Sequence, residues 1–377
     1  MSKNNLLLSL LMLCSSWAFT QNNEIERLVN AAFTAYNTGK YEEAIKYFDT
    51  VQVHAPAVYT SYLWQGKAYL NLCKYDESIK MAKIGLTFDD RNEELINLLV
   101  QNYYFIGNDH LRLNIRKKQY DEAPNNVDCI AAYAYSLFGM GDFKQGVSLL
   151  KEAIKIKPND PSLLNRLGFY LDVLNEKEAG LKLQNQALEA TDDDLMKAMI
   201  FSTLGKNDKA ILILDQLIQN NPAAGFYYNN IKASFLMEQS KFEEAKKMLE
   251  KSIKSQVHKN PTIFLIASTN NQLGNYQTVI DDLESIVKKY PHYYSANAVY
   301  CWALVEIGQL NEAKKLIDQT IDVKPLRPLA YFVKGLLYEK LNRPEIACEN
   351  FNKAKERYFE KLYTTNALST HLNKCSK

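Results

Sequence analysis

Residues that commonly carry out catalysis are present in this chain, but their spacing does not bring them together. The five histidines fall in separate stretches with no metal-ligand spacing: His54, His110, His258, His292 and His371. The HExxH, GxSxG, P-loop and GxGxxG patterns are absent. We therefore predict that the protein is not an enzyme and holds no metal or cofactor. An enzyme with an unrecognised kind of site is kept as a remote alternative.

One acidic run, Asp192 to Asp194, looks like a cation site. It stands directly before a helix expected to begin at Leu195. Carboxylates in that position accept hydrogen bonds from the first-turn N–H groups and stabilise the helix N-terminus. We interpret the run as a helix cap.

The cysteines do not suggest a disulfide framework. Beyond Cys14 there are five, an odd number, and none shows CxxC spacing. A framework is therefore not expected, although export would permit one. Cys348 and Cys375 are the one pair that we single out as a bridge to be checked.

Composition limits the classes of partner. Lys plus Arg total 45 against 43 for Asp plus Glu, which gives a net charge of +2. This balance offers no electrostatic reason to bind nucleic acid or an anionic membrane surface. The chain is 47% hydrophobic, too apolar for a disordered protein. No nucleic-acid partner is expected.

Residues 1–20 predict a signal peptide. Lys3 precedes an apolar run from Leu6 to Leu13, which is too short to span a bilayer permanently. Small residues follow at the −3 and −1 positions of two cleavage points: Ser16 with Ala18, and Ala18 with Thr20. The mature chain is therefore expected to begin at Phe19 or Gln21.

Such a signal predicts export, to the periplasm or out of the cell, with outer-membrane association left open. Lipid attachment at Cys14 is disfavoured, because Leu13 is bulky where lipoprotein sites take a small residue. A buried N-terminal helix is the alternative interpretation. No later segment is apolar for long enough to be transmembrane.

From residue 25 the sequence repeats. Ten units begin at 25, 59, 93, 127, 161, 191, 226, 260, 294 and 328, and all spacings are 34 or 35 except one of 30. Positions eight and twenty are mostly small, which lets two antiparallel helices approach closely. Position fifteen is Gly in six units and Asn in two, which suits a turn with positive φ. Each unit is therefore expected to be a helical hairpin. The short spacing is expected to trim the loop between units five and six and to bend the array near 188–195.

These units resemble the tetratricopeptide repeat (TPR) family, as in Gly39-Lys40-Tyr41-Glu42-Glu43-Ala44 and Gly308-Gln309-Leu310-Asn311-Glu312-Ala313. The resemblance covers residues 21–361. It implies an all-α solenoid of about ten TPR-like hairpins that form a right-handed superhelix, with the first helices lining a concave groove. The hairpins alone also indicate a solenoid, because each can bury its apolar face only against its neighbours. Residues 359–377 carry an apolar stripe and are expected to form a C-terminal capping helix and tail.

The family geometry implies that positions 2, 5, 9, 12 and 13 of each unit face the groove. Rings and amides there suit an extended peptide, because rings supply contact area and amides bond to its backbone. The candidate partner-binding residues are Phe33, Tyr36, Asn97, Gln101, Tyr104, Phe105, Tyr135, Phe138, Asn165, Phe169, Asn230 and Trp302. The alternative for each ring is packing between neighbouring first helices. The basic residues with which some family members clamp the carboxylate of a chaperone tail are missing, so that mode is not expected.

The second helix of unit three departs from the pattern. Its normally buried positions hold Arg112, Arg116 and Gln119, beside Lys117 and Lys118. We expect a one-residue register slip that turns Leu111 and Ile115 inward. The alternative is a basic docking patch on the convex side.

The predicted function is an exported scaffold or adaptor that holds a peptide or protein partner in the concave groove. The alternative is a structural subunit of an envelope or secretion assembly, docked through its convex face and ends. Substitutions in the groove would separate the two. The sequence does not name the partner.

Overall fold

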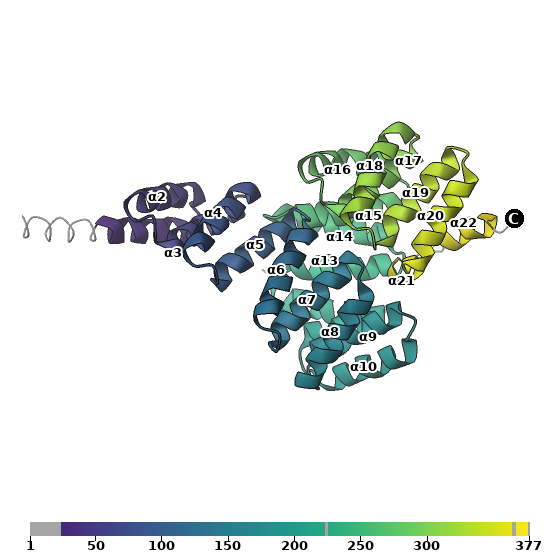
Figure 1. The fold of residues 1–377 in the computed structure, drawn as a ribbon, viewed down its shortest axis with the longest axis horizontal. Helices are drawn as coiled ribbons and strands as arrows, with labels where there is room; N and C mark the ends of the chain where they lie inside the picture. Colours follow the sequence, from purple (N-terminus) through teal and green to yellow (C-terminus); the bar gives the residue numbers. More distant parts are fainter. Residues whose placement is uncertain (1–23, 223–224, 364–366, 376–377) are drawn as a thin grey trace, which may run out of the picture. The chain divides into compact units, whose positions relative to one another are not determined.

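The computed structural model describes residues 24–222, 225–363 and 367–375. All regular structure in these residues is helical, so the predicted all-α fold is confirmed (Figure 1). The predicted signal peptide, with both cleavage points and Cys14, lies outside the described residues.

The chain divides into two compact units between Phe105 and Ile106. The first contains a helix over 24–37 followed by α2 (Tyr41–His54), α3 (Tyr59–Asn71), α4 (Tyr75–Phe88) and α5 (Glu93–Phe105). The second contains α6 (Asp109–Glu122), α7 (Val127–Met140), α8 (Phe143–Ile156), α9 (Pro161–Val173), α10 (Lys177–Glu189), α11 (Asp194–Thr203), α12 (Asn207–Asn220), α13 (Gly225–Glu238), α14 (Phe242–Ser252), the 3-10 helix η2 (Ile253–Ser255), α15 (Asn260–Gln272), α16 (Tyr276–Lys289), α17 (Tyr294–Glu306), α18 (Leu310–Val323), α19 (Pro328–Lys340), α20 (Pro344–Glu356), α21 (Phe359–Leu362) and α22 (Ala367–Cys375).

The units part inside the third repeat. The bend expected near 188–195 stays a prediction. In the third repeat alone, neither position eight nor position twenty is small, because Val100 and Arg112 occupy them. Side chains of that size keep two helices from crossing closely. The sequence therefore carried a signal for the position of the division.

Each repeat turns on one residue in the left-handed region of backbone conformation. At position fifteen, φ is positive for Gly39, Gly107, Gly141, Gly205, Gly274 and Gly308, and also for Cys73, Asn175, Ser240 and Asn342. In nine of these ten turns the next N–H donates back to the carbonyl five residues earlier, as from Lys40 to Ala35 at 2.9 Å. The expected positive φ is confirmed, and the turn imposes it even on cysteine and serine.

The crossing of α9 and α10 shows why positions eight and twenty are small. A Cβ atom at Gly180 would lie 2.5 Å from the backbone oxygen of Gly168. The equivalent pairs Ala32 with Ala44 and Ala198 with Ala210 are fully buried. Helix backbones therefore approach most closely at these positions, and a larger residue would push them apart.

We expect Gly180→Ala to destabilise the α9–α10 hairpin by about 1–2 kcal/mol, because overpacking at this backbone contact outweighs the better helix propensity of alanine. Hydrogen exchange in α9 and α10 would measure the effect locally. Gly139→Ala is the matched control, because a Cβ at this helical glycine meets no atom within 4 Å. Equal exchange in the two variants would contradict the packing argument.

The short spacing before residue 191 has a different origin from the one expected. The loop over 190–193 has four residues, like the loop over 157–160. It is α11 that is short and begins at Asp194. It has 10 residues, against 13 or 14 in the first helices α3, α5, α7, α9, α13, α15, α17 and α19. The Asp193 side chain accepts a hydrogen bond from the N–H of Met196 at 2.6 Å, so the acidic run is a helix cap as predicted.

The expected register slip in α6 is wrong. Leu111 is 37% exposed, whereas Leu113 packs against the core formed by α7, α8 and α9. Arg112 stays half-buried and donates to Asp109 at 2.6 Å, and Arg116 donates to Gln119 at 2.7 Å. No slip is needed because long basic side chains can pack their stems while their charged ends find partners.

Two helices, α21 and α22, follow the last hairpin where one was expected. Tyr358 has a φ of 63°, which interrupts the helix between α20 and α21. Phe359 and Leu368 are fully buried, and a disulfide joins Cys348 of α20 to Cys375 of α22. The bridge joins the one pair of cysteines that the sequence analysis singled out for checking. Together these contacts cover the end of the last hairpin, as solenoid ends require.

Candidate functional site

In the first unit, predicted residues of the first repeat meet a tryptophan of the second. Phe33 and Tyr36 make edge contacts with Trp64, with ring centroids 5.0 and 5.1 Å apart. The Lys67 ammonium lies 4.1 Å from the centre of the Trp64 ring, and Asn71 donates to the Tyr36 hydroxyl at 3.1 Å. Burial raises the pKa of Tyr36. All five side chains are half-buried, so each keeps some surface for a partner.

The third first helix, α5, continues this surface with exposed polar side chains. Lys67 on α3 pairs with Glu94 on α5 at 2.6 Å. Asn97, Gln101 and Tyr104 lie along α5 from Glu94 at helical spacing, and all are exposed, Tyr104 by 49%. We call the following set the first-unit face: Phe33, Tyr36, Trp64, Lys67, Asn71, Glu94, Asn97, Gln101 and Tyr104.

Phe105 does not extend the first-unit face in the way expected. Its ring stacks on that of Tyr75, a buried residue of α4, at 5.8 Å. It therefore packs back on a second helix. The predicted cluster from Tyr104 to Phe169 is also divided between the two compact units, and its remaining members belong to the second.

In the second unit, Tyr135 and Phe138 on α7 pack largely against α9. The Arg166 guanidinium lies 3.9 Å from the centre of the Tyr135 ring. Phe138 stacks on Tyr170 at 3.7 Å and lies 5.6 Å from Phe169. These rings are half-buried, and packing between neighbouring first helices accounts for much of their contact.

The three remaining candidates are also engaged within the fold. Asn165 is 5% exposed and accepts a hydrogen bond from Thr203 at 2.8 Å. Asn230 donates to Thr262 at 2.8 Å, and Trp302 packs edge-on against Phe332 at 5.2 Å. The structure therefore corrects the assignment of Asn165, whose buried amide joins α9 to α11 and is not presented to a partner.

Sequence reasoning missed Trp64, Asn71 and Arg166. Trp64 stands at position six of its unit, next to position five, and helical position alone did not select it. Residue type was the usable signal, because a half-exposed tryptophan is enriched among residues that dominate interfaces. Two of the basic residues considered for convex docking form ion pairs with acidic residues of the same helix. Lys117 and Lys118 pair with Asp121 and Glu122, at 2.5 and 3.7 Å.

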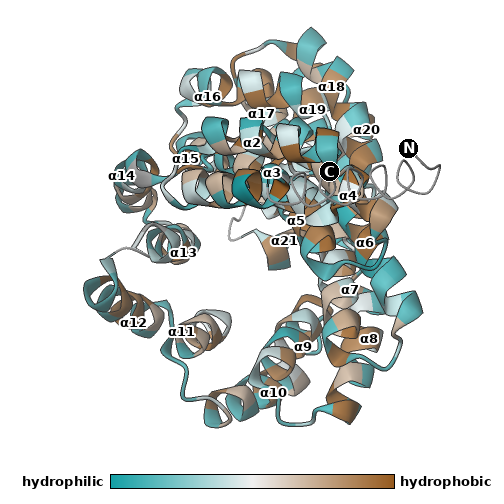
Figure 2. Cartoon of the chain, turned by 90° about the vertical axis from the view of Figure 1, so that its left-hand side faces the viewer, coloured by the Kyte–Doolittle hydropathy of each residue, from teal (hydrophilic) through white to brown (hydrophobic). Residues whose placement is uncertain are grey.

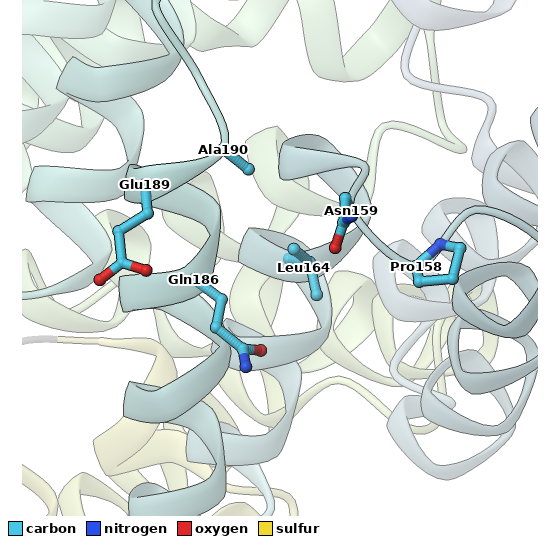
Figure 3. Close-up of a pocket in the computed structure, with 6 residues that line it drawn as sticks. All are labelled: Pro158, Asn159, Leu164, Gln186, Glu189 and Ala190. Carbon is cyan, nitrogen blue, oxygen red and sulfur yellow. The ribbon is translucent and has the colours of Figure 1, made fainter.

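An open pocket of about 440 Å³ lies in the second unit between the loop after α8, the start of α9 and the end of α10. Figure 3 shows its lining, which combines apolar side chains with two amides and one carboxylate: Pro158, Leu164, Ala190, Asn159, Gln186 and Glu189. This lining holds no pair of groups suited to nucleophilic or acid–base catalysis.

Other chemistry was sought across the described residues. No group of three His, Cys, Asp or Glu side chains there is arranged to hold a metal ion. None of the described helices has the length and apolar character needed to cross a membrane.

Comparison with known families agrees with the hairpin architecture. Descriptions of the tetratricopeptide repeat match residues 30–84, 127–160, 271–333 and 329–361. The chain is a tetratricopeptide repeat protein. It is accordingly a protein-interaction scaffold.

Curated relatives of this TPR protein are similar to it over part of their length. It is 26% identical over 231 residues to the human mitochondrial import receptor subunit TOM70, a match covering 59% of the chain and 36% of the relative. It is 26% identical over 86 residues to the phagocyte signaling-impaired protein of Aedes aegypti, covering 23% and 9%. The chain thus spans about a third of the human relative and less of the other.

Solved structures with similar folds include other TPR proteins. One from Parabacteroides merdae is 16% identical, covers 67% of this chain and 99% of its own, and has a TM-score of 0.44. YrrB, described as a TPR protein with an unusual peptide-binding site, is 16% identical, covers 47% and 95%, and has a TM-score of 0.39. MamA from Desulfovibrio magneticus is 16% identical, covers 45% and 97%, and has a TM-score of 0.39.

Proposed function

We propose that this TPR protein is an exported adaptor that holds an extended segment of a protein partner against the first-unit face. The observation that carries the proposal is the exposure of Asn97, Gln101 and Tyr104 in a row beside the half-buried Trp64 cluster. An extended backbone offers N–H and C=O groups that amides can bond, and its side chains can rest on the rings.

The chemistry of the face favours a peptide of mixed polarity. Lys67 and Glu94 neutralise each other, so the face has no strong charge with which to select an acidic or basic partner. Partly buried rings such as Trp64 offer apolar area, and their neighbours already restrict their motion. Binding therefore costs these side chains little conformational entropy. The similarity to part of an import receptor subunit supports a role in protein binding.

Capture with the mature protein from an envelope fraction of its own cells would test this function. Wild-type protein and the double variant Gln101→Ala/Tyr104→Ala would be compared, with Lys83→Ala on the exposed side of α4 as the control. We expect a partner that is retained by wild type and the control and lost by the double variant. A partner captured equally by all three would place binding elsewhere.

Export rests on the order of charge, apolar run and small residues in residues 1–20. The disulfide between Cys348 and Cys375 supports it, because such bonds persist in oxidising compartments. We expect N-terminal sequencing of the native protein to find Phe19 or Gln21 at its start. Recovery of the intact Met1 start would refute export by this signal, whereas a lipid on Cys14 would alter only the cleavage site.

A further inference from the structure

The beginning and the end of the second unit are in direct contact, although about two hundred residues separate them. Lys324, in the loop between α18 and α19, forms an ion pair with Asp109 at the start of α6. The same ammonium donates to the carbonyl oxygen of Gly139 in α7 at 3.1 Å. The His110 ring also contacts the carbonyl of Val323. In Figure 2 the helices of this unit follow a curve that brings α6 and α7 back toward α18 and α19.

The contact continues along the same edges beyond Lys324. Tyr358, before α21, meets Phe143 at the start of α8, with ring centroids 5.6 Å apart. Lys361 of α21 pairs with Asp172 of α9 at 3.3 Å. The turns after α5 and α7 and the last turn of α9 thus lie against segments that follow α16, α18 and α20. We call this row of contacts the seam.

Glycine packing shows that the seam is tight. A Cβ at Gly107 would lie 2.3 Å from the Tyr293 ring, and one at Gly141 would lie 2.7 Å from the backbone of Leu326. The other four positive-φ glycines, at the same position of their repeats, have no such neighbour within 4 Å: Gly39, Gly205, Gly274 and Gly308. Among the glycine turns, crowding therefore singles out the two that lie at the seam.

Lys324 is the most buried charge of the seam, with 6% of its side chain exposed. Burial lowers the pKa of Lys324. Burial alone would raise the pKa of Asp109, but Lys324 and Arg112 outweigh it and hold that pKa below its ordinary value. A buried ammonium is tolerated only when its partners remain in place, so its position depends on both sides of the seam.

We propose that the seam is an intramolecular latch, centred on Lys324, that closes the second unit on itself and fixes the curvature of its first-helix side. In a solenoid whose hairpins touch only their sequence neighbours, small rotations between repeats add up and curvature is easily changed. A contact between the first and last hairpins removes that freedom. This latch goes beyond the proposed binding function, which rests on the first unit.

Hydrogen exchange on the full-length mature protein tests the latch. We expect Lys324→Met to accelerate exchange about tenfold or more at 107–112 and 321–327 and also at 170–175 and 359–362, which do not touch Lys324. Lys334→Met is the matched control, because Lys334 pairs with Asp318 at 2.7 Å on two helices of the same region, outside the seam. Faster exchange confined to residues touching Lys324 would show local packing and overturn the latch.

A second pair of variants covers the case in which Lys324→Met unfolds the protein. Gly141→Ala and Gly308→Ala suffer the same strain at positive φ, but a Cβ is crowded only at Gly141. We expect Gly141→Ala to accelerate exchange along the whole seam and Gly308→Ala to act only on its own hairpin. Equivalent local effects from both variants would overturn the proposal.

Discussion

Reduction of the Cys348–Cys375 disulfide is expected to destabilise the C-terminal cap by roughly 3–4 kcal/mol. The bridge closes a loop with a sequence separation of 27 and ties α22 to α20. Without it, α22 is held by packing of Leu368, by stacking of His371 on Phe351 at 4.8 Å and by the pairing of Lys374 with Glu339. Hydrogen exchange in α19, α20 and α22 with and without reductant would measure the loss.

The effect of reduction should be local, because a solenoid transmits contacts between neighbours. Helices α11 to α14 are therefore expected to exchange at unchanged rates. Cys348→Ser is the control, because reductant should produce no further change in a variant that cannot form the bridge. If the oxidised, reduced and variant proteins all exchange alike, the disulfide does not hold the cap.

Replacing Trp64 by alanine is expected to weaken partner binding by about 2 kcal/mol, or roughly thirtyfold. Trp64 supplies the largest ring of the first-unit face and touches Phe33, Tyr36 and Lys67. Its loss removes contact area and also releases the neighbouring rings. Isothermal titration with the captured partner, or with the segment of it that binds, would measure the change.

Tyr104→Ala separates binding from folding, because Tyr104 is 49% exposed and its removal should cost little stability. We expect a loss of affinity close to that of Trp64→Ala, with an unchanged melting temperature. Lys83→Ala should leave affinity within about 0.5 kcal/mol. Normal binding by both ring variants, together with loss of binding on charge reversal at Lys117 and Lys118, would favour the convex-docked structural subunit instead.

The candidate surface was only partly predictable. Asn97, Gln101 and Tyr104 were found from helical position and are exposed, but Asn165, at the same position of its repeat as Asn97, is buried against Thr203. The difference lies in the neighbouring first helix, whose side chains decide whether a polar group meets solvent or a partner within the fold. Position in a repeat therefore predicts which way a residue points and not what it meets there.

The sequence by itself determined the hairpins. The small pair at Gly168 and Gly180, the positive-φ turns and the apolar periodicity all act between residues close in sequence, so their spacing is sufficient to predict them. The sequence also marks the repeat in which the chain divides, because the large residues Val100 and Arg112 stand at its two usually small positions. Only the tertiary structure decided which ends meet. The contact of Lys324 with Asp109 depends on the sum of rotations across the repeats between them, and no local pattern contains that sum.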